Sequence, residues 1–163
     1  MCIRDRAYIA EILKSLVWGG WQNIYMVFHH QSENDGLMPM SLACMKAAKK
    51  VTMRYLEEKR GYGWWGSNDM QDYYENLETD ANPLTFIKTI QLMDAQVQKD
   101  CGGFDHAGKF ETSLLSAVYP QNVDFARTAW NTEWFAIPSQ EASTELGEKM
   151  VALTLAYLEK TIV

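Results

Sequence analysis

The hydrophobic pattern near the start of the chain has helical spacing. Five apolar side chains recur at i, i+3, i+4, i+7 and i+8, at Ile9, Ile12, Leu13, Leu16 and Val17. Residues at these intervals lie on one face of an amphipathic helix. The pair Gly19-Gly20 follows directly and marks the end of the predicted helix.

A short apolar run, Ile24 to Phe28, comes next and shows no alternation of polar and apolar positions. Such a run predicts a strand that is buried on both faces, as in a parallel sheet. It ends in the polar sequence His-His-Gln-Ser-Glu-Asn-Asp-Gly at residues 29–36. Open α/β sheets bind their ligands at the carboxyl ends of such strands, so residues 29–36 are a candidate functional loop.

The rest of the chain contains further helical signals separated by glycine and proline. Helices are predicted from Ser41 to about Lys59, from Pro83 through Val97, from Lys109 to Val118, and from near Ser139 onward. The glycine-bounded aromatic segment 61–66 indicates a strand that runs into a loop, and residues 69–77 indicate a short helix or irregular structure. Helices that alternate with short buried strands predict an α/β fold with a layered sheet.

The composition is that of a globular domain. The chain has 163 residues, of which 47% are apolar and 22% charged, and this length suits one domain. Fifteen basic and 21 acidic residues give a net charge of −6, which argues against nucleic acid as the main partner. No apolar stretch reaches the roughly 18 residues of a membrane span, so no membrane partner is expected.

Three cysteines, Cys2, Cys44 and Cys101, are widely spaced, and the chain contains no CxxC motif. This pattern argues against a disulfide framework and against a cysteine zinc site, and it favours a cytoplasmic location. The first six residues, MCIRDR, resemble a translated adapter that is often found on reading frames from metagenomic assemblies. We therefore expect residues 1–6 to be non-native and residues 7–163 to form the single domain.

The three histidines lie in two segments, His29 and His30 after the predicted strand and His106 in a glycine-flanked loop. Imidazole is both a general acid or base near neutral pH and a common metal ligand. His30 and Glu33 are close enough in sequence to bind a metal ion from one loop, and mixed nitrogen and oxygen ligands suit Zn²⁺ or Mn²⁺. The alternative is that the two histidines cap the strand and Glu33 is solvated.

His106 and Glu111 are five positions apart and would not share a face of one helix. With His106 in the loop and Glu111 in the first helical turn, both side chains can point into one cleft. Alternatively, Glu111 only complements the helix dipole. The pair Trp64-Trp65 is a candidate wall of a small-molecule pocket, with core packing as the alternative for at least one of the two rings.

The segment Phe104 to Leu115, followed by Pro120 and Val123, resembles the motif D-H-A-G-x-x-E-T-S of the creatininase (creatinine amidohydrolase) family. Seven residues match this motif: Asp105, His106, Ala107, Gly108, Glu111, Thr112 and Ser113. Residues 142–149 resemble the C-terminal helix of the family, and residues 26–34 fall where the family has its N-G-H loop. The resemblance covers nearly the whole chain after residue 6.

The resemblance implies a layered α/β/α sandwich with a mostly parallel sheet, assembled as a homo-oligomer that is a hexamer in the family. It further implies a binuclear Zn²⁺ or Mn²⁺ centre that activates water to cleave a C–N bond in a small cyclic amide. By position, His106 is the catalytic histidine and Glu111 its carboxylate neighbour. Glu33 is a metal ligand, and either Gln31 or His30 stands where the family has its loop histidine.

One part of the family pattern has no counterpart here, namely the first strand and loop with an E-x-H arrangement followed by Asp. We therefore expect the chain to be the C-terminal part of a longer parent that lacks the first strand or strands. Three functions follow as hypotheses. The chain is a metal-dependent amidohydrolase, a non-catalytic fragment that retains the fold and part of the pocket, or a binding module for a carbohydrate or aromatic ligand.

Overall fold

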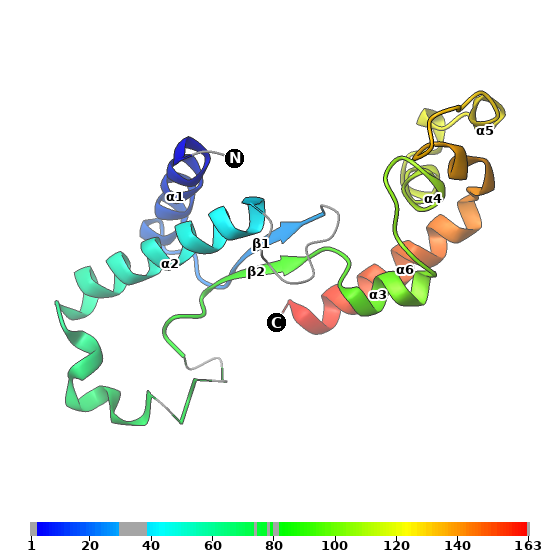
Figure 1. Ribbon diagram of the computed structural model, residues 1–163. Helices are drawn as coiled ribbons and strands as arrows, with labels where there is room; N and C mark the ends of the chain where they lie inside the picture. The colour runs from blue at the N-terminus through cyan, green and yellow to red at the C-terminus, as the bar shows by residue number, and fades with distance from the viewer. Residues whose placement is uncertain (1–2, 30–38, 74, 78, 80–81, 163) are drawn as a thin grey trace. The chain divides into compact units, whose positions relative to one another are not determined.

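The computed structural model describes residues 3–29, 39–73, 75–77, 79 and 82–162 (Figure 1). The chain forms two compact units, each with its own hydrophobic cluster. The N-terminal unit comprises the described residues within 3–28 and 39–90, and the C-terminal unit comprises residue 29 and residues 91–162. Among the described residues, no helix is both long and apolar enough to cross a membrane.

The N-terminal unit contains two long helices and the sheet. Its elements are α1 (Ile3–Trp18), β1 (Ile24–Phe28), α2 (Pro39–Arg60) and β2 (Ile87–Gln91). The two strands form a two-stranded sheet, and their arrows point in the same direction in Figure 1. The predictions of α1, β1 and α2 are confirmed. The structure is mixed α/β and mostly helical, while the layered sandwich stays a prediction.

The hydrophobic cluster of this unit joins both helices to the sheet. It contains Leu13, Val17, Ala47, Ala48, Val51 and Ile87, and the partly buried Ile24 and Met26 pack against it. Ile24 and Met26 alternate with Tyr25 and Val27, and Val27 is exposed. The expectation that β1 is buried on both faces is therefore wrong for the described residues, because α1 and α2 pack on the side that carries Ile24 and Met26.

Two other predictions in this unit are wrong. Residues 61–66 do not form a strand, because Gly61 and Gly63 have φ of 89° and 77° and turn the chain into the short 3₁₀ helix η1 (Trp64–Gly66). A second 3₁₀ helix, η2 (Asn68–Tyr73), follows. The segment 83–97 is not one helix, because β2 occupies Ile87–Gln91. Its β-branched residues favour the pleated conformation.

The C-terminal unit is helical. Its elements are α3 (Ala95–Cys101), α4 (Lys109–Val118), η3 (Pro120–Asn122), α5 (Phe125–Thr128), η4 (Ile137–Glu141) and α6 (Thr144–Thr161). Its core consists of Met93, Val97, Cys101 and Met150. The predicted bounds of α4 are confirmed. The last helix begins later than predicted, because the Ser143 hydroxyl accepts the N–H of Leu146 as its N-cap and residues 137–141 form η4.

Candidate active site

The loop between α3 and α4 is held by the side chain of Asp105. Its carboxylate oxygens accept the backbone N–H groups of Phe110 at 2.9 Å and of Glu111 at 3.1 Å. Helix N-termini leave their first N–H groups without partners inside the helix. Asp105 supplies acceptors for two of them, and this fixes the loop against the first turn of α4.

Two further positions of the loop have a restricted backbone, and at one of them, Gly108, only glycine fits. A Cβ on Gly108 would lie 2.5 Å from Asp105 Oδ2 and 3.1 Å from the Phe135 carbonyl oxygen, so a side chain at this position would displace the capping carboxylate. Ala107 has φ of 53°, a left-handed conformation that is unusual for a residue other than glycine. The loop is therefore tightly constrained.

Glu111 joins the helix to the loop. Its Oε2 accepts the N–H of Ala107 at 2.7 Å and lies 3.9 Å from His106 Nδ1. The structure thus brings His106 and Glu111 together, as the loop-and-helix arrangement predicted. The Glu111 side chain is 33% exposed and that of His106 is 68% exposed, so the imidazole is open to a ligand from solvent.

The His106 ring is also supported from its side. Its centroid lies 5.9 Å from that of Phe135, and Trp134 packs edge-on against the same phenyl ring at 5.6 Å. Phe135 is thus a common neighbour of one imidazole and one indole. This gives His106 an orientation that does not depend on Glu111 alone.

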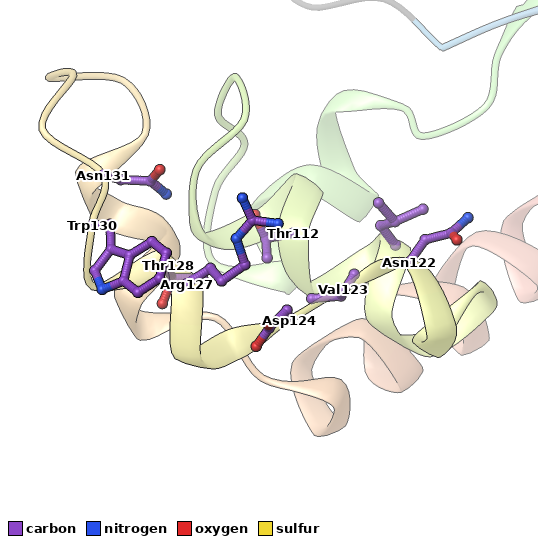
Figure 2. Close-up of a pocket in the computed structure, with 9 residues that line it drawn as sticks. Thr112, Asn122, Val123, Asp124, Arg127, Thr128, Trp130 and Asn131 are labelled. Atoms are coloured by element: carbon purple, nitrogen blue, oxygen red, sulfur yellow. The ribbon is translucent and has the colours of Figure 1, made fainter.

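The last two motif residues have different surroundings. Ser113 is fully buried, and its hydroxyl donates to the Lys109 carbonyl at 2.6 Å and accepts the N–H of Ser143 at 2.9 Å. Ser113 therefore joins α4 to the start of α6 and is not available to a ligand. Thr112, by contrast, lines a surface groove of about 440 Å³ (Figure 2).

Arg127 and Trp130 also line this groove, and the sequence analysis did not single them out. The Arg127 guanidinium lies over the Trp130 ring, 5.9 Å from its centroid. The signal in the sequence is their i, i+3 spacing, which brings two side chains together on one helical turn. That spacing alone does not reveal that residues 122–131 fold beside α4.

The two predicted substrate-binding tryptophans lie in the N-terminal unit. Trp64 is 4% exposed, with the Arg60 guanidinium over its ring at 5.3 Å, while Trp65 is 67% exposed. Trp64 is thus a packed ring, in line with the core-packing alternative for one member of the pair. The substrate-binding role of Trp64 and Trp65 stays a prediction.

The predicted metal ligands His30, Gln31 and Glu33 lie outside the described residues. Within the part of the chain that the structure describes, no three His, Cys, Asp or Glu side chains come together in a way that could hold a metal ion. His106 and Glu111 alone are fewer protein ligands than a zinc site uses. The described residues therefore do not fit a metal centre, and the metal-ligand assignment stays a prediction.

Comparison with known proteins gives one family. The family model described as "Creatininase: Creatinine amidohydrolase" matches residues 5–154. The match spans both units and includes the whole segment from Asp105 to Ser113. Searches of curated proteins and of solved structures found no match.

Proposed function

The chain belongs to the creatininase family, and on this premise we propose that it is an amidohydrolase that cleaves a C–N bond in a small cyclic amide. The observation that carries the proposal is the position of His106, whose Nδ1 lies 3.9 Å from Glu111 Oε2 in a loop fixed by Asp105. This arrangement is suited to proton transfer at an exposed ligand.

Amide hydrolysis needs a proton to move from the attacking water to the leaving nitrogen. In the proposed reaction, the water oxygen bonds to the amide carbon and His106 takes the water proton. The C–N bond then breaks, and His106 returns the proton to the leaving nitrogen. The products are a carboxylic acid and an amine, which pass on the second water proton to become a carboxylate and an ammonium group, and they remain joined when the amide was cyclic. The His106 nitrogen that does not face Glu111, Nε2, is the one available for this transfer.

Glu111 positions the imidazole in this proposal. Its Oε2 is held by the Ala107 N–H at 2.7 Å, so the carboxylate has a fixed place in front of Nδ1. A carboxylate in front of one ring nitrogen stabilises the protonated imidazole that forms during the reaction. The arrangement resembles the general case in which a third group orients the catalytic base.

Glu33, together with either His30 or Gln31, is the proposed ligand set for a divalent zinc or manganese ion, from the spacing of these residues and from the resemblance. These residues lie outside the described part of the chain, and within that part no cluster of three His, Cys, Asp or Glu side chains that could hold a metal ion is found. We also propose a cytoplasmic homo-oligomer without a nucleic-acid or membrane partner. The acidic net charge of −6 supports the exclusion of nucleic acid.

The test is an assay of hydrolysis on a panel of small cyclic amides, with and without added Zn²⁺ or Mn²⁺. Hydrolysis is measured as the release of amino groups. We expect turnover of at least one compound, and we expect His106→Ala to lower kcat about 100-fold or more. Trp134→Ala is the matched control, because it removes the other ring that packs on Phe135 and leaves the imidazole in place. Equal loss in both variants, or full activity in His106→Ala, would contradict the proposal.

A further inference from the structure

The groove beside the motif has the size of a small-molecule site. Its volume of about 440 Å³ falls within the range of ligand pockets. The residues that matter for its chemistry are Thr112, Leu115, Asn122, Val123, Arg127 and Trp130. They come from α4, from η3 and the residue after it, and from α5 and the turn that follows it (Figure 2). The proposed hydrolysis uses none of these side chains.

Arg127 is the cation of the groove. Its guanidinium carbon lies 5.9 Å from the centroid of the Trp130 ring, within the range of a cation–π contact, and among the described residues its N–H groups make no hydrogen bond. Among the described residues, no carboxylate forms an ion pair with Arg127. The nearest acid in the sequence, Asp124, accepts the N–H of Ala126 at 3.0 Å as the N-cap of α5. Figure 2 shows the Asp124 carboxylate pointing away from the Arg127 guanidinium.

Two neutral polar groups of the groove are also available. Within the described part of the chain, the Thr112 hydroxyl and the Asn122 amide make no hydrogen bond. By contrast, the Thr128 hydroxyl donates to the Phe125 carbonyl at 2.8 Å, and the Asn131 amide donates to the Ser139 hydroxyl at 2.7 Å. Thr112 and Asn122 can therefore donate to an acceptor held by Arg127.

We propose that this groove binds a small molecule that carries a carboxylate on a flat apolar skeleton. A guanidinium and a carboxylate form two parallel charge-assisted hydrogen bonds, and within the described part of the chain no carboxylate already occupies the Arg127 guanidinium. Leu115 and Val123 provide apolar surface for the skeleton. A dianionic phosphate fits less well, because the groove has a single cation and also contains Asp124, and because the chain carries a net charge of −6.

The test compares para-fluorobenzoate with its neutral isostere para-fluorobenzamide by fluorine NMR on the full chain. We expect the benzoate to bind at least about 10-fold more tightly, and Arg127→Gln to remove most of this preference. Arg127→Lys should also weaken binding, because an ammonium group neither stacks nor bonds in the paired manner. Circular dichroism checks that these exposed substitutions leave the fold intact.

Lys109→Gln is the matched control, since it removes one positive charge from the same unit, where Lys109 pairs with Glu141 at 3.2 Å. We expect less than about a twofold change in benzoate affinity, as for an exposed ion pair. Three results would overturn the proposal: equal affinity for benzoate and benzamide, unchanged affinity in Arg127→Gln, or equal losses in Arg127→Gln and Lys109→Gln. Stronger binding of inorganic phosphate than of benzoate would also overturn the assignment of a carboxylate.

Discussion

Gly147 of α6 lies directly against the backbone of Ser113 in α4. A Cβ on Gly147 would be 1.9 Å from the Ser113 carbonyl oxygen and 2.8 Å from the Ala117 Cβ. The Ser113 hydroxyl also accepts the N–H of Ser143, so the start of α6 is fixed to α4 at two neighbouring points. Since α4 also carries Glu111 and Thr112, this contact sets the support for both the candidate active site and the groove.

We therefore expect Gly147→Ala to destabilise the C-terminal unit. Alanine is favoured over glycine within a helix by about 1 kcal/mol, but overpacking costs typically 1–3 kcal/mol and more when a rigid backbone is the obstacle. The clash is with a carbonyl oxygen, so the net effect should be a loss of about 2 kcal/mol in the free energy of unfolding, measured in urea. Gly66→Ala is the control, because its Cβ would meet nothing within 4 Å. Unchanged stability in Gly147→Ala would show that the two helices do not pack this closely.

The second prediction concerns Asp105, which caps α4 and also holds the loop that carries His106. Asp105→Ala should lower the free energy of unfolding by about 1–2 kcal/mol, because two backbone N–H groups of α4 lose their acceptor. It should also lower kcat, because the loop that holds His106 loses its anchor.

The comparison variant for Asp105 is Asp94→Ala. Asp94 caps α3 by accepting the N–H of Val97 at 2.8 Å, and it belongs to the same unit. We expect a similar loss of stability with much less change in kcat. Equal effects of the two variants on kcat, once stability is accounted for, would show that Asp105 has no special part in positioning His106.

Some elements of the fold are encoded by local sequence patterns, and others depend on contacts with distant residues. The helices α1, α2 and α4 were predictable because each carries apolar residues at helical spacing between clear end signals. Pro83 predicts the start of a helix, yet the Asn82 side chain accepts the N–H of Leu84 at 2.9 Å and forms a local turn instead. The chain then enters β2, and directly before this strand the Phe86 carbonyl accepts the N–H of Ile24 at 2.7 Å. Such a contact depends on a partner far away in sequence.

The candidate site also has one part that the local sequence predicts and another part that it does not. The proximity of His106 and Glu111 was predictable, because both belong to one loop and one helical turn. The groove was not, because it needs Arg127 and Trp130 to fold back beside Thr112, and no local pattern encodes that approach. The sequence also could not show that Ser113 is buried in a helix contact, since its environment is set by Ser143, thirty residues further on.

A third prediction concerns the carboxylate in front of His106. Glu111→Gln keeps the size of the side chain and an acceptor for the Ala107 N–H, but removes the charge beside Nδ1. If Glu111 supports proton transfer, kcat should fall about 10-fold or more, as for a group that assists a general base. The measurement is kcat on the compound identified in the hydrolysis panel.

Glu145 supplies the matched control for this substitution. It lies in the first turn of α6 as Glu111 lies in the first turn of α4, so Glu145→Gln removes the same favourable interaction with a helix dipole. Both variants should lose about 0.3–1 kcal/mol of stability, whereas only Glu111→Gln should lose activity. Equal kcat values for the two variants would show that Glu111 only complements the dipole of α4 and does not assist His106.

The last prediction uses one buried cysteine in each unit, Cys44 and Cys101, which are both 5% exposed. Burial raises the pKa of both thiols above the ordinary value of 9.0. The folded chain therefore retains these thiol protons at a pH where the unfolded chain has released them. The contribution of the two buried thiols to the free energy of unfolding is full below pH 9 and is lost as the pH rises through their pKa values in the folded state.

We expect iodoacetamide to modify both cysteines slowly in the native protein and quickly in urea, as measured by mass spectrometry of each cysteine peptide. In Gly147→Ala, Cys101 should react at a lower urea concentration than in the unsubstituted protein, while Cys44 keeps its protection. Equal loss of protection at both residues would show that the two units unfold together.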